Sequence, residues 1–217
     1  MLVDLNLQNK VVIVIGEGDE VETRVQQFLD AAAKVIVVDY RPNKNLKRLK
    51  SVKYVKWDRR GNFNELMEKY NPYALILATT NKQFASKISK AARRKHCPLV
   101  YAVDMPDLND FNMPAVAKLG DIRIAISTGG LSPAMASILR KKIERMITAE
   151  DLQEVRLQAL MRDRIKDRIR NAELRKRCIY KIIHDEQIRK YLQDNKFEQA
   201  KKLAAKQIAS IANRGMS

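Results

Sequence analysis

An uninterrupted run of β-branched residues, from Val11 to Ile15, ends directly in the glycine-rich turn Gly16-Glu17-Gly18. Such a run without polar alternation is typical of a strand that is buried on both faces of a parallel sheet. Apolar residues at helical spacing follow the turn, and a second apolar strand follows at residues 34–39. A strand, a helix and another strand within about 30 residues predict a βαβ unit with a right-handed crossover.

The alternation of strands and helices continues through the first half of the chain. We expect three more strands, at residues 53–57, 73–78 and 98–103. We expect helices near residues 63–70 and from a Thr79-Thr80-Asn81 cap to about Lys95. Beyond residue 111 the pattern changes to two short strands around a glycine-containing turn and then a helix, at residues 112–118, 122–127 and 134–147.

The last third of the chain is predicted to be helical. From Ala149 onward it contains one glycine and no proline, and Leu, Ile and Ala recur at helical spacing. The fold class is therefore α/β, with a Rossmann-like parallel sheet domain, a small α+β region and a helical C-terminal domain. We place these three parts at residues 1–111, 112–148 and 149–217.

The composition limits the cellular context of the protein. No uncharged apolar stretch approaches the roughly 20 residues that a membrane span needs, and the N-terminus lacks the basic start and apolar core of a signal peptide. We therefore expect a cytoplasmic protein that does not enter a membrane. Cys97 and Cys178 lie far apart without nearby histidines, so we expect neither a disulfide framework nor a zinc site.

The formal net charge of +17 indicates an acidic partner, such as a nucleic acid, an anionic lipid or a small polyanion. The excess of basic residues is shared between residues 1–150 and 151–217 and is not confined to a tail. The most basic window is 41–60, and we interpret it as a solvated loop beside the sheet in preference to a dedicated nucleic-acid site. The distribution therefore disfavours nucleic acid as the partner.

The turn Gly16-x-Gly18-x-x-Val21 is an imperfect dinucleotide-binding fingerprint, because Val21 stands where a small residue is usual. Asp39 ends the next strand 21 positions after Gly18. An acid there accepts both ribose hydroxyls and favours NAD over NADP, although Arg41 lies close by. The alternative is a purely structural strand-to-helix turn. If the motif binds NAD, we expect the contacts at Gly16, Gly18, Asp19, Glu20, Val21, Asp39, Thr79 and Thr80.

Two later segments carry candidate site residues. Asp104 closes the strand at 98–103, at the carboxyl edge where open α/β sheets bind ligands, and is a candidate general base. Asp107 and Asp110 follow it, and the segment fits a turn and helix cap equally well. The second segment is the loop at residues 127–133, Ser-Thr-Gly-Gly-Leu-Ser-Pro, which precedes a helix and offers backbone N–H groups and hydroxyls to an anion.

These motifs resemble those of the precorrin-2 dehydrogenase family, the N-terminal module of siroheme synthase. The resemblance covers residues 1–150 well and the helical remainder more loosely. The residues that carry it are Gly16-x-Gly18-Asp19, Ala78-Thr79-Thr80-Asn81, Ala102-Val103-Asp104, Phe111-x-Met113-Pro114-Ala115 and the 127–133 loop.

The resemblance implies an NAD-dependent oxidation of precorrin-2 to sirohydrochlorin by a homodimer, with residues 112–148 as the dimerisation region. It places the family's active-site aspartate on Asp104 and, on Thr128, a serine that closes the substrate side in some members. We therefore expect a carboxylate-rich tetrapyrrole to bind at Thr128, Gly129, Gly130 and Ser132. Some members also insert ferrous iron. The sequence shows no metal-ligand cluster, so we predict no metal site and leave ferrochelatase activity open.

Two alternatives to an active dehydrogenase stay open. One is a nucleotide-sensing regulatory module whose basic helical part binds nucleic acid or a protein partner. It accounts for the alternating basic residues at 162–170 but not for the 127–133 loop. The other is a family member that has lost the dehydrogenase, because Glu17, Val21 and Thr128 depart from the family's pattern.

Overall fold

The computed structural model of the protein describes residues 2–39, 49, 51–57 and 62–214, with the backbone alone for Asp39 and Arg214. The chain forms two compact units, Met1–Met113 and Pro114–Ser217, and each is described by itself. The boundary between them lies close to the one predicted after residue 111. The division of the second unit at residue 148 stays a prediction.

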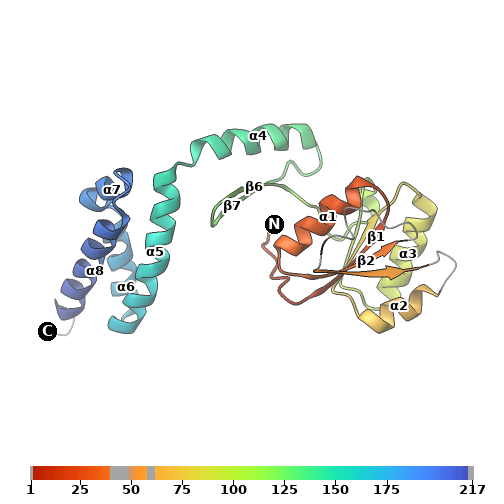
Figure 1. The fold of residues 1–217 in the computed structure, drawn as a ribbon, viewed down its shortest axis with the longest axis horizontal. Coiled ribbons are helices and arrows are strands. Elements are labelled where there is room, and N and C mark those ends of the chain that lie inside the picture. Colours follow the sequence, from red (N-terminus) through yellow and green to blue (C-terminus); the bar gives the residue numbers. More distant parts are fainter. Residues whose placement is uncertain (1, 40–48, 50, 58–61, 215–217) are drawn as a thin grey trace. The chain divides into compact units, whose positions relative to one another are not determined.

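The first unit confirms the predicted Rossmann-like α/β fold (Figure 1). Its strands form one parallel sheet in the order β3-β2-β1-β4-β5. The chain adds β2 and β3 on one side of β1 and then β4 and β5 on the other, so the strand order reverses between β1 and β4. The elements are β1 (Val11–Gly16), α1 (Asp19–Asp30), β2 (Lys34–Asp39), β3 (Val52–Lys56), α2 (Phe63–Tyr70), β4 (Ala74–Ala78), α3 (Lys82–Arg94), β5 (Leu99–Ala102) and the short 3₁₀ helix η2 (Pro106–Leu108).

The central strands are buried on both faces, as the uninterrupted β-branched run predicts. Ile13 and Ile15 of β1 pack into a core that α2 and α3 cover. Val12 and Val14 point the other way, into a second core that α1 covers. Alternate residues of a strand face opposite sides of a sheet, so a sheet with helices on both sides leaves no place for polar residues in β1.

A polar cap at the carboxyl edge of the sheet fixes where α3 begins, whereas α1 begins without one. The Asn81 side chain accepts a hydrogen bond from the backbone N–H of Phe84 at 2.9 Å, which confirms the predicted start of α3. Thr79 Oγ1 accepts from the Asn81 N–H at 3.2 Å. By contrast, Gly18 precedes α1 without any side-chain cap. The first N–H groups of α1 therefore keep their hydrogen-bonding capacity for another partner.

The second unit begins with an antiparallel hairpin. Its strands β6 (Ala115–Leu119) and β7 (Ile122–Ile126) pair around the two-residue turn Gly120-Asp121. Gly120 has a φ of +55°, a conformation that suits glycine in such a turn. The helices that follow are α4 (Pro133–Met146), α5 (Ala149–Arg168), α6 (Ala172–Ile183), α7 (Glu186–Gln193) and α8 (Phe197–Arg214).

The hairpin begins at Ala115, so the predicted strand start at residue 112 is wrong. Contacts in the first unit hold the preceding residues instead. The Phe111 ring packs against Tyr101 with centroids 5.4 Å apart, and Met113 Sδ accepts a hydrogen bond from Arg24 at 3.4 Å. Pro114 has no N–H to give to a strand ladder. The remaining predicted strands lie within two residues of their observed bounds.

The last four helices build a core of their own. Leu157 and Ile165 of α5 meet Ile182 of α6 and Ile208 of α8, and each of these side chains is at most 1% exposed. This core confirms the predicted helical C-terminal part. In the part of the chain that the structure describes, no helix has both the length and the apolar character to cross a membrane.

Candidate functional site

The carboxyl ends of β1 and β4 meet at the point where the strand order reverses, which is where open α/β sheets bind their ligands. Gly16 ends β1 and pairs with Ala78, the last residue of β4. A Cβ on Gly16 would lie only 2.0 Å from the Ala78 carbonyl oxygen, so no other residue fits there. This glycine is needed for the close approach of the two strands.

Gly18 opens the space above the turn. Its φ of +86° is a conformation that only glycine adopts readily, and no heavy atom lies within 4 Å of where its Cβ would be. The uncapped N-terminus of α1 begins at the next residue, Asp19. Free N–H groups and open space together form the kind of site that holds a phosphate group at a helix N-terminus.

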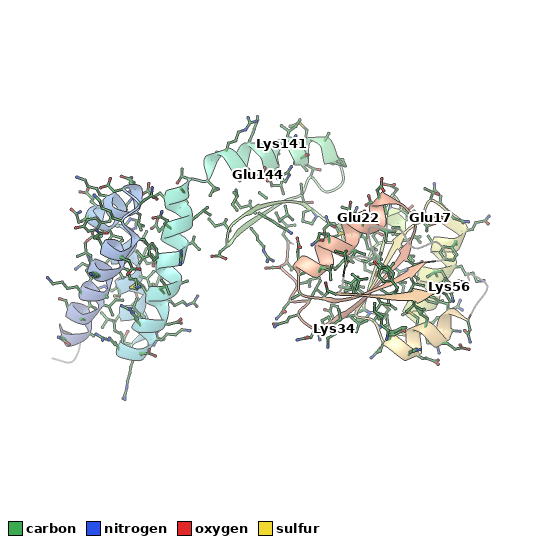
Figure 2. All side chains as sticks on the ribbon, in the orientation of Figure 1. Glu17, Glu22, Lys34, Lys56, Lys141 and Glu144 are labelled. Carbon is green, nitrogen blue, oxygen red and sulfur yellow. The ribbon has the colours of Figure 1, made fainter. Side chains whose placement is uncertain are left out.

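Acidic residues crowd this helix end, which works against an anionic ligand. Glu20 forms an ion pair with Arg24 one turn further along α1, so its charge is compensated. Glu17 and Glu22 also lie at this end (Figure 2). Burial raises the pKa of the Tyr54 phenol on β3, and the Glu22 carboxylate raises it further. Tyr54 therefore stays protonated at neutral pH.

Val21, the residue that departs from the fingerprint, is directed away from the site. It is 1% exposed and packs in the core beneath α1 with Val12 and Val25. A branched side chain at this position is therefore accommodated by the core and does not block the turn.

The other expected nucleotide contacts lie along the same sheet edge. Asp39 ends β2, next to β1, and its side chain lies outside the described part of the structure. Thr79 and Thr80 follow β4, and Thr80 is exposed. Arg41 and most of the basic window at 41–60 fall outside the described residues.

Asp104 follows β5 and is exposed at the carboxyl edge of the sheet. Its backbone φ of +59° is unusual for a residue other than glycine, a kind of strain that is concentrated at functional sites. The preceding residue anchors it, because the Val103 N–H donates to the Leu77 carbonyl of β4 at 2.9 Å. Among the described residues, the Asp104 carboxylate has no hydrogen-bond or ion-pair partner.

The two acids after Asp104 have different surroundings. Asp110 accepts hydrogen bonds from the Val100 N–H at 2.8 Å and from Arg93 at 2.9 Å, so it holds the loop against β5. The Asn109 side chain also holds the loop against β5, because its Oδ1 accepts a hydrogen bond from the Ala102 N–H at 2.6 Å. Asp107 is exposed in η2. The turn interpretation thus fits Asp110, and the candidate base is Asp104.

The 127–133 loop lies in the second unit and is tied together by its own hydroxyls. Ser127 Oγ accepts from the Gly129 N–H at 3.2 Å, and Thr128 Oγ1 accepts from the Ser132 N–H at 3.1 Å. Ser132 caps α4 by accepting from the Met135 N–H at 3.2 Å. The Gly129 N–H is thus bonded within the loop, and its contact with a substrate carboxylate stays a prediction.

Several donors of the loop have no acceptor among the described residues. Gly129 and Gly130 have φ of +63° and +85°, with no heavy atom within 4 Å of their Cβ positions. A hydroxyl that accepts from a backbone N–H keeps its own hydrogen, so Thr128 and Ser132 can still donate. Leu131 is 91% exposed beside them. The loop presents donors and one apolar side chain in open space.

Sequence reasoning missed one cluster next to the first site. The Arg24 guanidinium lies over the Tyr101 ring, 5.4 Å from its centroid, and donates to Gln27 at 3.1 Å and to Met113. It links α1 to the last residues of the first unit. A lone arginine in an amphipathic helix gives no sequence signal for such a contact. Among the described residues, no three His, Cys, Asp or Glu side chains gather as a metal site.

Comparisons with known proteins match both units. The family described as putative NAD(P)-binding matches residues 3–115, and the family described as sirohaem biosynthesis protein central matches residues 120–146. Siroheme synthase of Psychromonas ingrahamii is 29% identical over 194 residues, which are 89% of this chain and 40% of that protein. The siroheme biosynthesis protein met8 of Schizosaccharomyces pombe is 30% identical over 170 residues, or 77% of this chain and 63% of that protein.

The fold agrees with one solved structure along nearly its whole length. That structure is the precorrin-2 dehydrogenase SirC, with a TM-score of 0.71 at 20% identity, covering 93% of this chain and 99% of SirC. The chain spans about 40% of the siroheme synthase from P. ingrahamii. The similarity thus reaches beyond the nucleotide fingerprint and includes the segment with the 127–133 loop and α4.

Proposed function

This chain belongs to the siroheme synthase and precorrin-2 dehydrogenase family, and on that premise we propose that it oxidises precorrin-2 to sirohydrochlorin with NAD⁺. One observation carries the proposal most. Asp104 stands exposed, in a strained backbone conformation, at the same sheet edge as the Gly16–Gly18 turn. A carboxylate and an open strand-to-helix turn at one sheet edge fit a dehydrogenase that uses a carboxylate base.

The residues at the β1–α1 turn fit a dinucleotide. The open space over Gly18 and the uncapped start of α1 suit a pyrophosphate, and the Glu20–Arg24 ion pair reduces the repulsion it meets. Asp39 would accept the ribose hydroxyls, which favours NAD over NADP, and Thr79 and Thr80 would line the neighbouring strand end. When bound, NAD⁺ supplies the hydride acceptor.

The oxidation removes two hydrogens from precorrin-2, one as hydride and one as a proton. We assign the proton to Asp104. Its carboxylate is exposed and has no partner among the described residues, so it can accept a proton from a bound substrate. The Val103 hydrogen bond to β4 and the Asp110 contacts hold the loop on both sides of it.

The 127–133 loop would bind the carboxylates of the tetrapyrrole. The Gly130 N–H and the hydroxyl hydrogens of Thr128 and Ser132 are the available donors, and Leu131 would cover apolar parts of the ring. Precorrin-2 carries many carboxylates, so a chain with a net charge of +17 attracts it over a distance. We also propose that the protein is a homodimer joined through residues 112–148.

Anaerobic incubation of the purified protein with precorrin-2 and NAD⁺ tests this function. We expect the sirohydrochlorin absorption spectrum to develop in the presence of NAD⁺ and not in its absence. If precorrin-2 persists although NAD⁺ binds, the chain has lost the dehydrogenase reaction. Titration with NAD⁺ and NADP⁺ in parallel tests the cofactor preference that we assign to Asp39.

A further inference from the structure

The segment that carries Asp104, residues 103–112, is contacted at both of its ends by one side chain, that of Arg24 in α1. We call this segment the Asp104 loop. Before the loop, the Arg24 guanidinium lies over the ring of Tyr101 in β5, with its carbon 5.4 Å from the ring centroid. After the loop, Arg24 donates a hydrogen bond to Met113 Sδ at 3.4 Å. The same guanidinium therefore closes the base of the loop.

Aromatic packing joins the two ends of the Asp104 loop into one cluster. The Phe111 ring lies 5.4 Å from the Tyr101 ring, centroid to centroid, at an interplanar angle of 37°. Tyr101 thus contacts both Arg24 and Phe111, and Met113 contacts Arg24 two residues further along the chain. All three apolar members pack against the core that α1 covers. Arg24 is the polar member that comes from α1, so its contacts tie the loop ends to that helix.

The same guanidinium also reaches toward the nucleotide end of α1. Arg24 forms an ion pair with Glu20, which lies one turn closer to the Gly16–Gly18 turn. It donates a further hydrogen bond to Gln27 at 3.1 Å. A guanidinium is planar and presents five donors in a fixed fork, so it can hold several partners at one time. One side chain is thus shared by the candidate nucleotide site and the Asp104 loop.

Arg24 is more deeply buried than an ion pair on a helix surface requires. Its side chain is 15% exposed, whereas that of Arg93, which pairs with Asp110, is 40% exposed. The Arg24 Nε–H is buried and has no hydrogen-bond partner within the described residues. A buried donor without a partner costs free energy. A surface ion pair alone does not need this burial, so we interpret it as serving the contacts with Tyr101 and Met113.

We propose that Arg24 is a positioning residue for the dehydrogenation and couples the nucleotide turn to the candidate base. The inference rests on the proposed function. Arg24 acts through Glu20 on one side and through the Asp104 loop on the other. NAD⁺ that binds at the start of α1 meets a compensated Glu20, and the same contact network holds the loop of Asp104. Binding at the turn and order in the loop are thereby linked, and such a coupling is reciprocal.

Arg24→Lys separates this role from simple charge compensation. The lysine ammonium keeps a positive charge for Glu20 but lacks the planar fork that lies over Tyr101 and reaches Met113. We expect NAD⁺ to bind within about twofold of the wild-type Kd, while precorrin-2 turnover at saturating NAD⁺ falls about 10- to 100-fold, because a misplaced reacting group is costly. Unchanged turnover in Arg24→Lys overturns the proposal.

A double variant gives an independent check. Arg24→Ala leaves the Glu20 charge uncompensated near the nucleotide turn, so NAD⁺ affinity should fall about threefold. Adding Glu20→Gln removes that charge, so the affinity should recover while turnover stays low. Lys95→Ala is the control, because it breaks the 2.6 Å ion pair with Glu68 elsewhere in the same unit and should change neither quantity. Turnover that recovers together with affinity, or an equal loss in Lys95→Ala, contradicts the positioning role.

Amide hydrogen exchange gives a result that does not depend on turnover. In wild type, we expect saturating NAD⁺ to slow exchange in residues 103–112 about threefold or more, and in Arg24→Lys we expect this slowing to be lost although NAD⁺ is bound. No slowing in wild type, or equal slowing in both proteins, overturns the coupling and leaves the dehydrogenase intact. A wild type that shows the slowing but does not convert precorrin-2 has the coupling without the proposed dehydrogenase.

Discussion

The Ala78 carbonyl oxygen lies 2.0 Å from the position that a Cβ on Gly16 would occupy, so the ends of β1 and β4 meet over a glycine that nothing can replace. We expect Gly16→Ala to separate these strand ends and to lower the free energy of unfolding by about 3 kcal/mol. Urea unfolding measures the loss. Gly18→Ala is the matched control, because no atom lies within 4 Å there and only backbone strain opposes it. A larger loss for Gly18→Ala contradicts this interpretation.

Two substitutions at Asp104 can separate the effect of its strained backbone on stability from the effect of its carboxylate on activity. With φ at +59°, Asp104→Gly relieves the strain that Asp104→Ala retains, so the glycine variant should be the more stable of the two by about 1 kcal/mol. Both variants lack the carboxylate, so both should convert precorrin-2 about 100-fold more slowly or worse. Thermal unfolding and turnover of the same samples check the two statements. Equal turnover by wild type and Asp104→Ala removes Asp104 as the base.

Asp110 has a structural role that a variant can isolate. Asp110→Ala leaves the Val100 N–H without its partner, and the loss of such a buried hydrogen bond costs about 1–2 kcal/mol. We expect lower stability in urea and a smaller loss of turnover than for Asp104→Ala. If Asp110→Ala is as stable as wild type but inactive, Asp110 takes part in the chemistry and our assignment is wrong.

Cys97 should be unreactive in the folded protein. Burial raises the pKa of its thiol from the ordinary 9.0 to about 11. Between these two pH values the unfolded chain loses the thiol proton and the folded chain keeps it, so the free energy of unfolding falls as pH rises through this window. Below pH 9 the thiol has no such effect. Cys97→Ala should show a shallower decline than wild type, and a thiol reagent at neutral pH should label Cys97 only after unfolding.

The β1–turn–α1 segment could be predicted from the sequence because its determinants are local. Three features within about 30 residues indicate the segment. They are an apolar run that is buried on both faces, a glycine where two strands approach closely, and an acid at the end of the next strand. The boundary at β6 could not be predicted in the same way. Phe111 and Met113 have residue types that are common in strands. Their contacts with Tyr101 and Arg24 hold them outside the hairpin, and these contacts are not visible in the sequence.

The candidate site was predictable to the extent that residue type decides its chemistry. From the residues alone, Asp104 fits a general base and a turn equally well, and the resemblance to the family selects it as the candidate base. Adjacent glycines before a helix indicate an anion-binding loop directly, because they let backbone N–H groups approach a ligand. The bond from the Gly129 N–H to Ser127 could not be predicted, because it depends on a side-chain rotamer.

The most direct measurement is the stoichiometry of NADH and sirohydrochlorin when wild-type protein, NAD⁺ and precorrin-2 react without oxygen. We expect the two products to appear together in equal amounts, and both to slow in parallel in Asp104→Ala while NAD⁺ still binds. Sirohydrochlorin that forms without NADH, or NAD⁺ and precorrin-2 that both bind wild type without reacting, would contradict the proposed dehydrogenase.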